Sequence, residues 1–407
     1  MKAGESLFLE AGLALVFVLA PAAFGGVHGW AFTAAGAWLF LLLFLFPDAS
    51  LEIERLPPFF VLGMFLLFAW ILVQGLFFSL QRYATGMEIL KWLSAAAGFV
   101  LIQHLPKASL YRLAFLLVLT SFLISLYGLI QTLSGAEKVL WQAKEFHRGF
   151  VTGTYMNRNH FAGFVELALG IAVGFLFSAL RERRFVRVFF SAGIVWVIIA
   201  ALFLSGSRGG LASFMISLAL FSVLLARAGK RQSIRGLFFL LLLFGLAAFL
   251  LAGQPWFGRL TGESGYELAH GRPVVWENTL RLIQNHGWKG TGLGGFAWVF
   301  PQFQSERLQV FWDHAHNDYL ELAAELGLPA FFLALSCFGI LGWRVIRSLH
   351  RLGTRPFRLV GGIFVSLTSF AIHGLSDFNF AIPANRLLFI FLFSMMFRMI
   401  RQEEAPA

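Results

Sequence analysis

Residues 109–133 read SLYRLAFLLVLTSFLISLYGLIQTL, a run in which Arg112 is the one charged side chain. A helix of about 20 mostly apolar residues is long enough to cross the hydrocarbon core of a bilayer. Apolar side chains occur on every face of this run, whereas a soluble amphipathic helix confines them to a stripe. The run therefore predicts a helix surrounded by lipid and by other apolar helices.

Similar runs recur along the chain, and 58% of the 407 residues are hydrophobic while 13% are charged. Soluble domains have about 25% charged residues. Unbroken apolar runs also exclude an outer-membrane barrel, whose strands would alternate. We expect an all-α, polytopic transmembrane bundle of about 12 helices. The runs lie at 7–25, 30–47, 58–79, 86–104, 109–133, 159–180, 186–204, 209–226, 235–252, 318–343, 357–376 and 384–400.

The basic residues indicate the orientation, because Lys and Arg concentrate in short cytoplasmic loops. The first run resembles a signal peptide, but Glu10 and the many later spans favour a retained anchor. With the N-terminus in the cytoplasm, three dense arginine clusters and the C-terminus also lie inside. The net charge of +11 then reflects topology, and we expect no nucleic-acid partner. The cytoplasmic residues would be Lys107, Arg112, Arg181, Arg183, Arg184, Arg187, Arg227, Lys230, Arg231, Arg235, Arg344, Arg347, Arg351, Arg355, Arg358, Arg398 and Arg401.

Two outer segments, 134–157 and 253–317, are too long to be simple turns. The longer one contains several tryptophans, which suit a membrane interface, and its 275–284 portion has the pattern of an amphipathic helix. We predict transmembrane helices 1–9 in residues 1–252, an outer lobe at 253–317, helices 10–12 in 318–401 and a tail at 402–407. The helices form one integrated membrane domain.

Two arginines stand beside glycines on the outer side. Residues 206–210 read GSRGG, a short turn in which glycine lets a ligand approach the backbone and Arg208 needs an anionic partner. Residues 271–276 read GRPVVW, and Arg272 would open the amphipathic helix, where a helix N-terminus attracts anions. Together they could clamp a pyrophosphate, although either arginine could instead be a solvated surface residue.

The long loop returns to the membrane at 314–320, HAHNDYL. Histidine is suited to accept a proton near neutral pH, so His314 and His316 are candidate bases, and a helix continuing from Asn317 would align it with Glu321 and Glu325. An interfacial histidine that caps a helix is the alternative. No third ligand for a zinc ion is evident beside the H-x-H pair, and we expect no metal and no cofactor.

Weaker candidates lie at two other outer positions. Asn157, Arg158, Asn159 and His160 begin the sixth run and could bind sugar hydroxyls, although helix capping by Asn157 explains it equally well. His373, Asp377, Asn379 and Arg386 surround the last outer turn and could line the same cavity, although Asp377 and Arg386 could instead form a structural pair. The single cysteine, Cys337, lies inside a predicted span and excludes an intrachain disulfide.

At these residues the chain resembles the O-antigen ligase/polymerase superfamily of bacterial envelope glycosyltransferases. The resemblance rests on GSRGG at 206–210, on Gly271-Arg272 with Trp276 followed by GTGLG at 290–294, and on His316-Asn317 followed by ELG at 325–327. It extends from GTYMNRN at 153–159 to the C-terminus. A proline that family members commonly have before the glycine-rich turn is absent from 286–290.

The resemblance implies transfer of a glycan from undecaprenyl pyrophosphate to an acceptor sugar, such as lipid A-core, at the periplasmic face of the bacterial inner membrane. It places Arg208 and Arg272 on the pyrophosphate and His316 on the acceptor hydroxyl, without metal. Direct displacement by an activated hydroxyl would invert the anomeric configuration. The predicted substrate contacts are Asn157, Arg158, Asn159, His314, Asn317, Glu325 and Arg386.

A ligase is the favoured interpretation, because the reactive residues are confined to one long loop and its neighbours. A polysaccharide polymerase and a protein O-oligosaccharyltransferase share the donor chemistry. A lipid-glycan flippase is a different class of protein, and it would carry ionisable residues near the bilayer midplane.

Overall fold

The computed structural model describes residues 3–49, 52, 56–227, 266–348 and 354–404. This part of the chain is helical apart from turns and one small hairpin. The first helices are α1 (Ala3–Ala22), α2 (Gly29–Leu45), α3 (Pro58–Val73), α4 (Arg82–Gln103) and α5 (Lys107–Leu133). The hairpin, β1 (Lys138–Val139) and β2 (Gln142–Ala143), precedes α6 (Arg158–Arg181), α7 (Phe185–Leu204) and α8 (Arg208–Arg227). The remaining helices are α11 (Tyr266–His286), α12 (Phe296–Val299), α13 (Asp318–Leu326), α14 (Leu328–Ser348), α15 (Thr354–His373) and α16 (Pro383–Glu404).

Eight helical segments of the described chain are long and apolar enough to cross a membrane: α1, α3 with its π-helical extension to Phe78, α4, α5, α6, α7, α14 and α16. Three shorter apolar helices, Gly29–Leu45, Arg208–Leu224 and Phe357–His373, coincide with further predicted runs. The polytopic helical bundle expected from the sequence is thus confirmed, and the chain is a multi-pass membrane protein. The predicted span 235–252 lies outside the described residues, as do Trp256 and the first part of the long loop.

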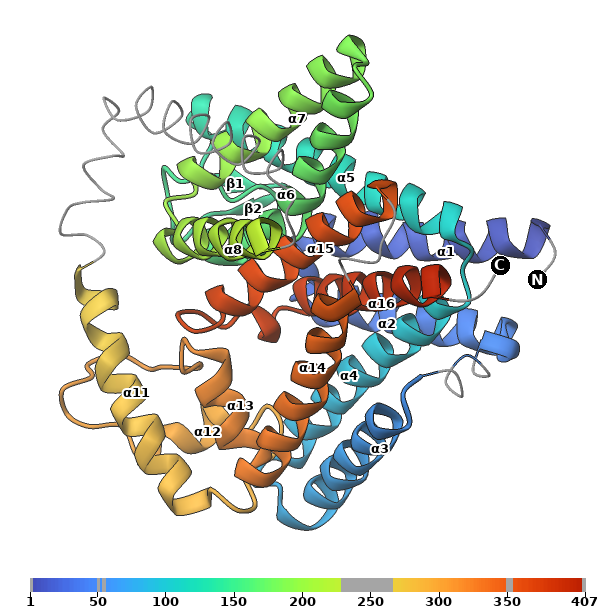
Figure 1. Cartoon of the computed structure of the whole chain (residues 1–407). Coiled ribbons are helices and arrows are strands. Elements are labelled where there is room, and N and C mark those ends of the chain that lie inside the picture. Colours follow the sequence, from blue (N-terminus) through green and yellow to red (C-terminus); the bar gives the residue numbers. More distant parts are fainter. Residues whose placement is uncertain (1–2, 50–51, 53–55, 228–265, 349–353, 405–407) are drawn as a thin grey trace.

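Helices α6, α15 and α16 form the centre of the bundle, and α6 packs along α15 with backbone in contact with backbone (Figure 1). A Cβ atom added to Gly170 of α6 would lie 2.5 Å from the carbonyl oxygen of Gly362 in α15, and one added to Gly362 would lie 2.6 Å from that of Gly170. Small residues of this kind let membrane helices approach closely. This close contact aligns the N-terminal end of α6 with the C-terminal end of α15, where several candidate site residues lie.

The predicted span 318–343 is wrong as a single helix. Gly327 has φ of +81° and ends α13, and α14 begins at the next residue. A hydropathy pattern does not register such a break, because the break depends on backbone conformation and not on polarity. The consequence is a separate short helix, α13, which carries buried acidic residues next to the membrane.

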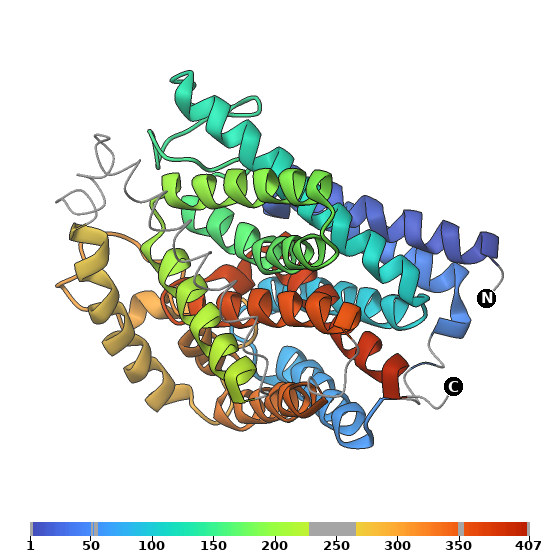
Figure 2. The same ribbon diagram turned by 45° about the horizontal axis from the view of Figure 1, so that its top comes forward.

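The outer segment has a hydrophobic cluster of its own. Val275 and Leu282 of α11 pack with Phe296, Phe300 and Trp312, and the cluster continues into α13. The chain termini lie at the end of the molecule opposite α11 in both views (Figures 1 and 2). Residues 402–407 were predicted to form a tail, but α16 continues to Glu404.

Candidate functional site

Three arginines from three separate helices converge at one place. Arg158 is the first residue of α6, Arg208 is the first residue of α8, and Arg272 lies in α11. The positive charges of Arg208 and Arg272 both act on the Arg158 guanidinium. None of the three forms a salt bridge with a carboxylate within the described part of the chain. Converging guanidinium groups of this kind suit an anion with several oxygens, such as a phosphate.

Local packing explains how two of the arginines are held. The Arg158 guanidinium lies 4.2 Å from the centre of the Phe150 ring, and Arg272 donates Nη1 to the Ser376 carbonyl oxygen at 2.7 Å. Gly206 has φ of +64°, and a Cβ atom added there would lie 2.6 Å from the Phe150 ring and 3.2 Å from Nη1 of Arg158. The glycine before Ser207 therefore leaves room for Arg158 beside the α8 turn.

One sequence interpretation of Arg272 is wrong. The residue was expected at the N-terminus of an amphipathic helix, but α11 begins earlier, at Tyr266, and includes Arg272 and Pro273. The free N–H groups of the first turn of α11 therefore do not lie at Arg272. Its contribution to an anion site comes from the guanidinium group and from the placement of that group by Ser376.

His316 and Asp377 face each other beside the arginines. Nδ1 of His316 lies 3.5 Å from Oδ1 of Asp377, whose side chain is 1% exposed. Burial alone would raise the pKa of Asp377, but contact with His316 and the positive charge of Arg272 hold it well below its usual value. The carboxylate is therefore ionised and lies beside the His316 ring, but it makes no hydrogen bond to it, since Nδ1 of His316 has no hydrogen-bond partner in the described chain.

The backbone at His316 is strained. Its φ of +48° is unusual for a residue with a Cβ atom and costs about 1–3 kcal/mol, a cost typical of functional sites. The ring is held edge to face by Trp312 and Phe378, with centroids 5.2 and 4.7 Å away. Trp276, from the GRPVVW motif, donates its indole N–H to the Ala315 carbonyl oxygen at 3.0 Å. The tryptophans of the outer segment thus hold the loop that presents His316.

His314 faces a different partner. Its Nδ1 lies 2.7 Å from Oε1 of Glu321, and its ring stacks on Phe378 with centroids 4.0 Å apart. Burial would lower the pKa of His314, but the Glu321 carboxylate raises it to about 9. A histidine that stays protonated at neutral pH is a poor general base. Of the two histidines in the HAH motif, His316 is the one placed to accept a proton.

Several buried polar atoms around this cluster have no hydrogen-bond partner in the described chain. They include Nε of Arg158 and of Arg272, Nε2 of His160 and Oδ2 of Asp377. Buried polar groups in proteins are nearly always paired. A concentration of unpaired ones at a single place supports a site that binds a polar ligand.

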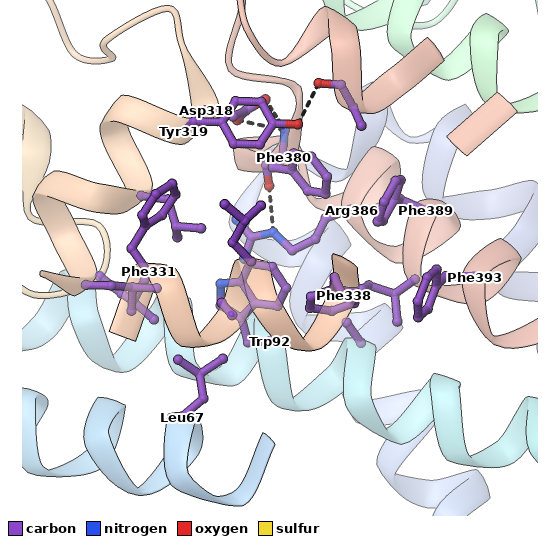
Figure 3. Close-up of a pocket in the computed structure, with 18 of the residues that line it drawn as sticks. Leu67, Trp92, Asp318, Tyr319, Phe331, Phe338, Phe380, Arg386, Phe389 and Phe393 are labelled. Carbon is purple, nitrogen blue, oxygen red and sulfur yellow. Dashed lines mark hydrogen bonds between the residues drawn. The ribbon is translucent and has the colours of Figure 1, made fainter. Parts of the chain in front are cut away.

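A large apolar cavity of about 890 Å³ lies among the helices beside this region. Helices α3, α4, α14, α15 and α16 line it with aromatic and aliphatic residues such as Trp92 and Phe338, and Asp318, Tyr319 and Arg386 lie toward one end (Figure 3). His314 also lines it. Because His314 and His316 both pack against Phe378, the polar end of the cavity adjoins the histidine–aspartate pair.

The other sequence candidates have structural partners. Asn157 caps α6 by accepting from the N–H of Asn159 at 2.8 Å, and Asn317 caps α13 by accepting from the N–H groups of Tyr319 and Leu320. Glu325 accepts from the N–H of Phe296 at 3.1 Å and, like Arg386, lines the cavity.

The suggested Asp377–Arg386 pair is absent from the described structure. Arg386 instead forms a salt bridge with Glu88 at 2.8 Å. The side chain of Asp377 faces His316.

Sequence reasoning undervalued three residues of this site. Asp377 and His160 were among the weaker candidates, in the last outer turn and at the start of the sixth run, and His147 was not a candidate. Burial and the charge of Arg158 lower the pKa of His147 to about 4, so it is neutral near the arginines. Asp377 reaches His316 through packing between distant segments, and no local motif marks such an approach.

Comparison with known proteins shows what the chain is similar to. Residues 193–335, which include Arg208, Arg272 and His316, match the family model described as O-Antigen ligase. Over 347 residues the chain is 23% identical to the teichuronic acid biosynthesis protein TuaE of Bacillus subtilis (strain 168), covering 80% of this chain and 69% of that protein. The resemblance predicted from the motifs is confirmed.

Proposed function

We propose that this protein is a membrane glycosyltransferase of polysaccharide biosynthesis that moves a glycan from a lipid pyrophosphate carrier to an acceptor sugar. The observation that carries the proposal is the convergence of Arg158, Arg208 and Arg272 beside the His316–Asp377 pair. The match of residues 193–335 to the O-antigen ligase family supports it. The site faces the periplasm in the proposed topology, and the chain resides in the bacterial inner membrane.

In the proposed step, the acceptor hydroxyl oxygen attacks the anomeric carbon of the donor sugar. His316 Nε2 takes the hydroxyl proton, the bond from carbon to the pyrophosphate oxygen breaks, and the lipid pyrophosphate leaves with both electrons of that bond. Asp377 stabilises the imidazolium that forms. A single displacement of this kind inverts the anomeric configuration.

The arginines act where negative charge develops. As the pyrophosphate leaves, preorganised guanidinium groups stabilise its new charge more than the charge of the bound donor, and this difference lowers the barrier. Charge-assisted hydrogen bonds contribute about 1.5–3 kcal/mol each, and a general base contributes about 10²–10⁴-fold in rate. The guanidinium groups supply the positive charge, so we propose a metal-independent reaction.

The cavity supports a lipid-linked substrate. Its apolar walls suit hydrocarbon chains, and its polar end adjoins His316 through His314 and Phe378. Among the predicted substrate contacts, Arg158 has the strongest support because of its place between the other arginines. Asn159, His314, Glu325 and Arg386 are proposed contacts of lower rank, and Asn157 and Asn317 act first as helix caps.

The acceptor we propose is the sugar of lipid A-core, which makes the protein a ligase. A second candidate is a polymerase that extends a growing polysaccharide, and one observation favours it: the relative TuaE is named for teichuronic acid biosynthesis. Deleting the gene and separating the lipopolysaccharide on a gel distinguishes the two. Loss of all long chains indicates a ligase, a ladder reduced to one repeat indicates a polymerase, and unchanged lipopolysaccharide points to another acceptor.

The chemical proposal is tested with purified protein in nanodiscs and a lipid-pyrophosphate-linked glycan. We expect transfer to persist in EDTA and to be lost in Arg208→Ala, Arg272→Ala and His316→Ala. Arg281→Ala is the matched control, because Arg281 is an exposed residue of α11 paired with Glu277. An active His316→Ala protein would contradict the assignment of the base, and loss of activity in EDTA would contradict metal independence.

A further inference from the structure

A buried glutamate and a buried histidine form a pair that the proposed transfer step does not use. His373, the last residue of α15, places Nδ1 3.2 Å from Oε2 of Glu166 in α6. Both side chains are at most 1% exposed. Ionisable residues inside membrane helices are costly to bury and usually have a function. The contacts of this pair indicate which function that is.

On one side, the pair contacts the first turn of α8. Nε2 of His373 lies 3.5 Å from Oγ of Ser207, and that hydroxyl accepts from the N–H of Gly210 at 3.3 Å, as a helix cap does. Oε1 of Glu166 lies 3.0 Å from the Ser213 hydroxyl, whose proton is shared with the Gly209 carbonyl oxygen at 2.5 Å. The turn that begins with Arg208 is therefore held on both sides, through Ser207 and through Ser213.

The glycines of the GSRGG motif make this contact possible. A Cβ atom added to Gly209 would lie 2.8 Å from Oγ of Ser376 and 2.9 Å from Cδ2 of His373. One added to Gly210 would lie 3.0 Å from Oε1 of Glu166. The two glycines thus let α8 approach the glutamate–histidine pair, which explains residues of the motif other than Arg208.

On the other side, His373 begins the turn that carries the remaining site contacts. Its carbonyl oxygen accepts from the N–H of Ser376 at 2.9 Å. Ser376 in turn accepts from Arg272, and the following residue, Asp377, faces His316. One histidine therefore connects the α8 turn to the residues that hold Arg272 and His316.

We propose that Glu166 and His373 are positioning residues, which keep Arg208 aligned with Arg272 and His316 during glycan transfer. The expected effect on kcat rests on the proposed function. The expected effect on the position of Arg208 rests only on the contacts described above. Neither residue touches the substrate in this scheme. They act through the first turn of α8 and through residues 374–377.

The test compares Glu166→Gln, His373→Gln and the double variant in nanodiscs. Because misplaced groups lower the rate of the chemical step, we expect kcat to fall about 10- to 100-fold while KM for the donor stays within about 2-fold. The double variant should lose no more than the worse single variant, since residues acting as a unit are not additive. Glu10→Gln is the matched control, because Glu10 is another buried glutamate, paired with Arg112, and it should keep the normal kcat.

Amide hydrogen exchange provides a readout that does not depend on activity. We expect both single variants to exchange faster at 208–213 and at 374–377 together, whereas Glu10→Gln should not change either segment. If Glu166→Gln does not fold, Ser213→Ala removes one hydrogen bond from Glu166 and should show the same pattern at smaller size. Normal kcat with unchanged exchange, or losses that multiply in the double variant, would overturn the inference. A wild-type protein that transfers no glycan would refute the proposed function, and exchange would still decide the positioning role.

Discussion

At His316, the reactivity of one ring nitrogen depends on what faces the other. Asp377 is buried and ionised 3.5 Å from Nδ1. Asparagine has nearly the same shape but cannot stabilise an imidazolium by charge. We expect Asp377→Asn to lower kcat by about 10²–10⁴-fold with folding preserved, measured by glycan transfer and by thermal unfolding. Asp313→Asn, at an exposed position beside His314, should stay active, and a fully active Asp377→Asn would remove Asp377 from the mechanism.

The His314–Glu321 contact gives a pH dependence of stability. In the folded state the pKa of His314 is raised from 6.5 to about 9. The negative charge of Glu321, with those of Asp313 and Glu325, outweighs the effect of burial. The stabilisation is therefore complete below pH 6.5 and is lost as pH rises through about 9.

We expect Tm to decline over that range, and Glu321→Gln to lower Tm below pH 6.5 and to flatten the decline. An unchanged slope in Glu321→Gln would assign the pH dependence to other groups.

The sequence marks residues whose neighbours along the chain form a motif, and it does not mark those assembled by packing. Arg208, Arg272 and His316 were predicted because glycine, tryptophan or asparagine accompanies each of them. Asp377 has no such neighbours, and its role depends on α15 bringing it to a loop that ends some sixty residues earlier in the chain. The family resemblance assigned the role of base to His316, whereas the HAH residues alone left His314 and His316 open, because partners from other segments distinguish the two.

At the scale of elements, the break between α13 and α14 is the largest departure from the predicted spans. Gly327 has φ of +81°, and a Cβ atom there would lie 2.6 Å from the Trp288 carbonyl oxygen. We expect Gly327→Ala to lower the free energy of unfolding by about 1–3 kcal/mol, measured by chemical or thermal denaturation. Gly339→Ala is the control inside α14, where nothing lies within 4 Å and alanine should be neutral or stabilising. Equal effects of the two substitutions would contradict the strain argument.

Most spans could be predicted because the bilayer imposes their length and apolarity on the sequence. The start of α11 and the end of α13 could not, because no such constraint acts on outer segments. In α11 the helix continues on the N-terminal side of the apolar pattern, through Arg272 and Pro273, back to Tyr266. Arg272 is therefore held by the hydrogen bond from its side chain to the Ser376 carbonyl oxygen, and it does not lie at a helix end.

At the scale of the whole molecule, the three arginines lie at the start of α6, at the start of α8 and within α11, and His316 lies two residues before α13. Both chain termini lie at the opposite end (Figures 1 and 2). The long interval between Arg158 and Asp377 in the chain is closed by the central packing of α6, α15 and α16. The order of the helices therefore converts residues scattered through the sequence into a single site at one end of the bundle.

This arrangement allows the proposed orientation to be tested directly. In a Cys337→Ser background, which removes the one native cysteine, single cysteines would be placed at exposed positions as Ala136→Cys, Glu306→Cys and Arg184→Cys. If the termini are cytoplasmic, a membrane-impermeant maleimide added to intact spheroplasts should label positions 136 and 306 and should label position 184 only after permeabilisation. The charge distribution leads to this expectation, because the turn from α6 to α7 is rich in arginine. Labelling of position 184 alone in intact cells would reverse the orientation and place the arginine–histidine site in the cytoplasm, where a periplasmic acceptor could not reach it.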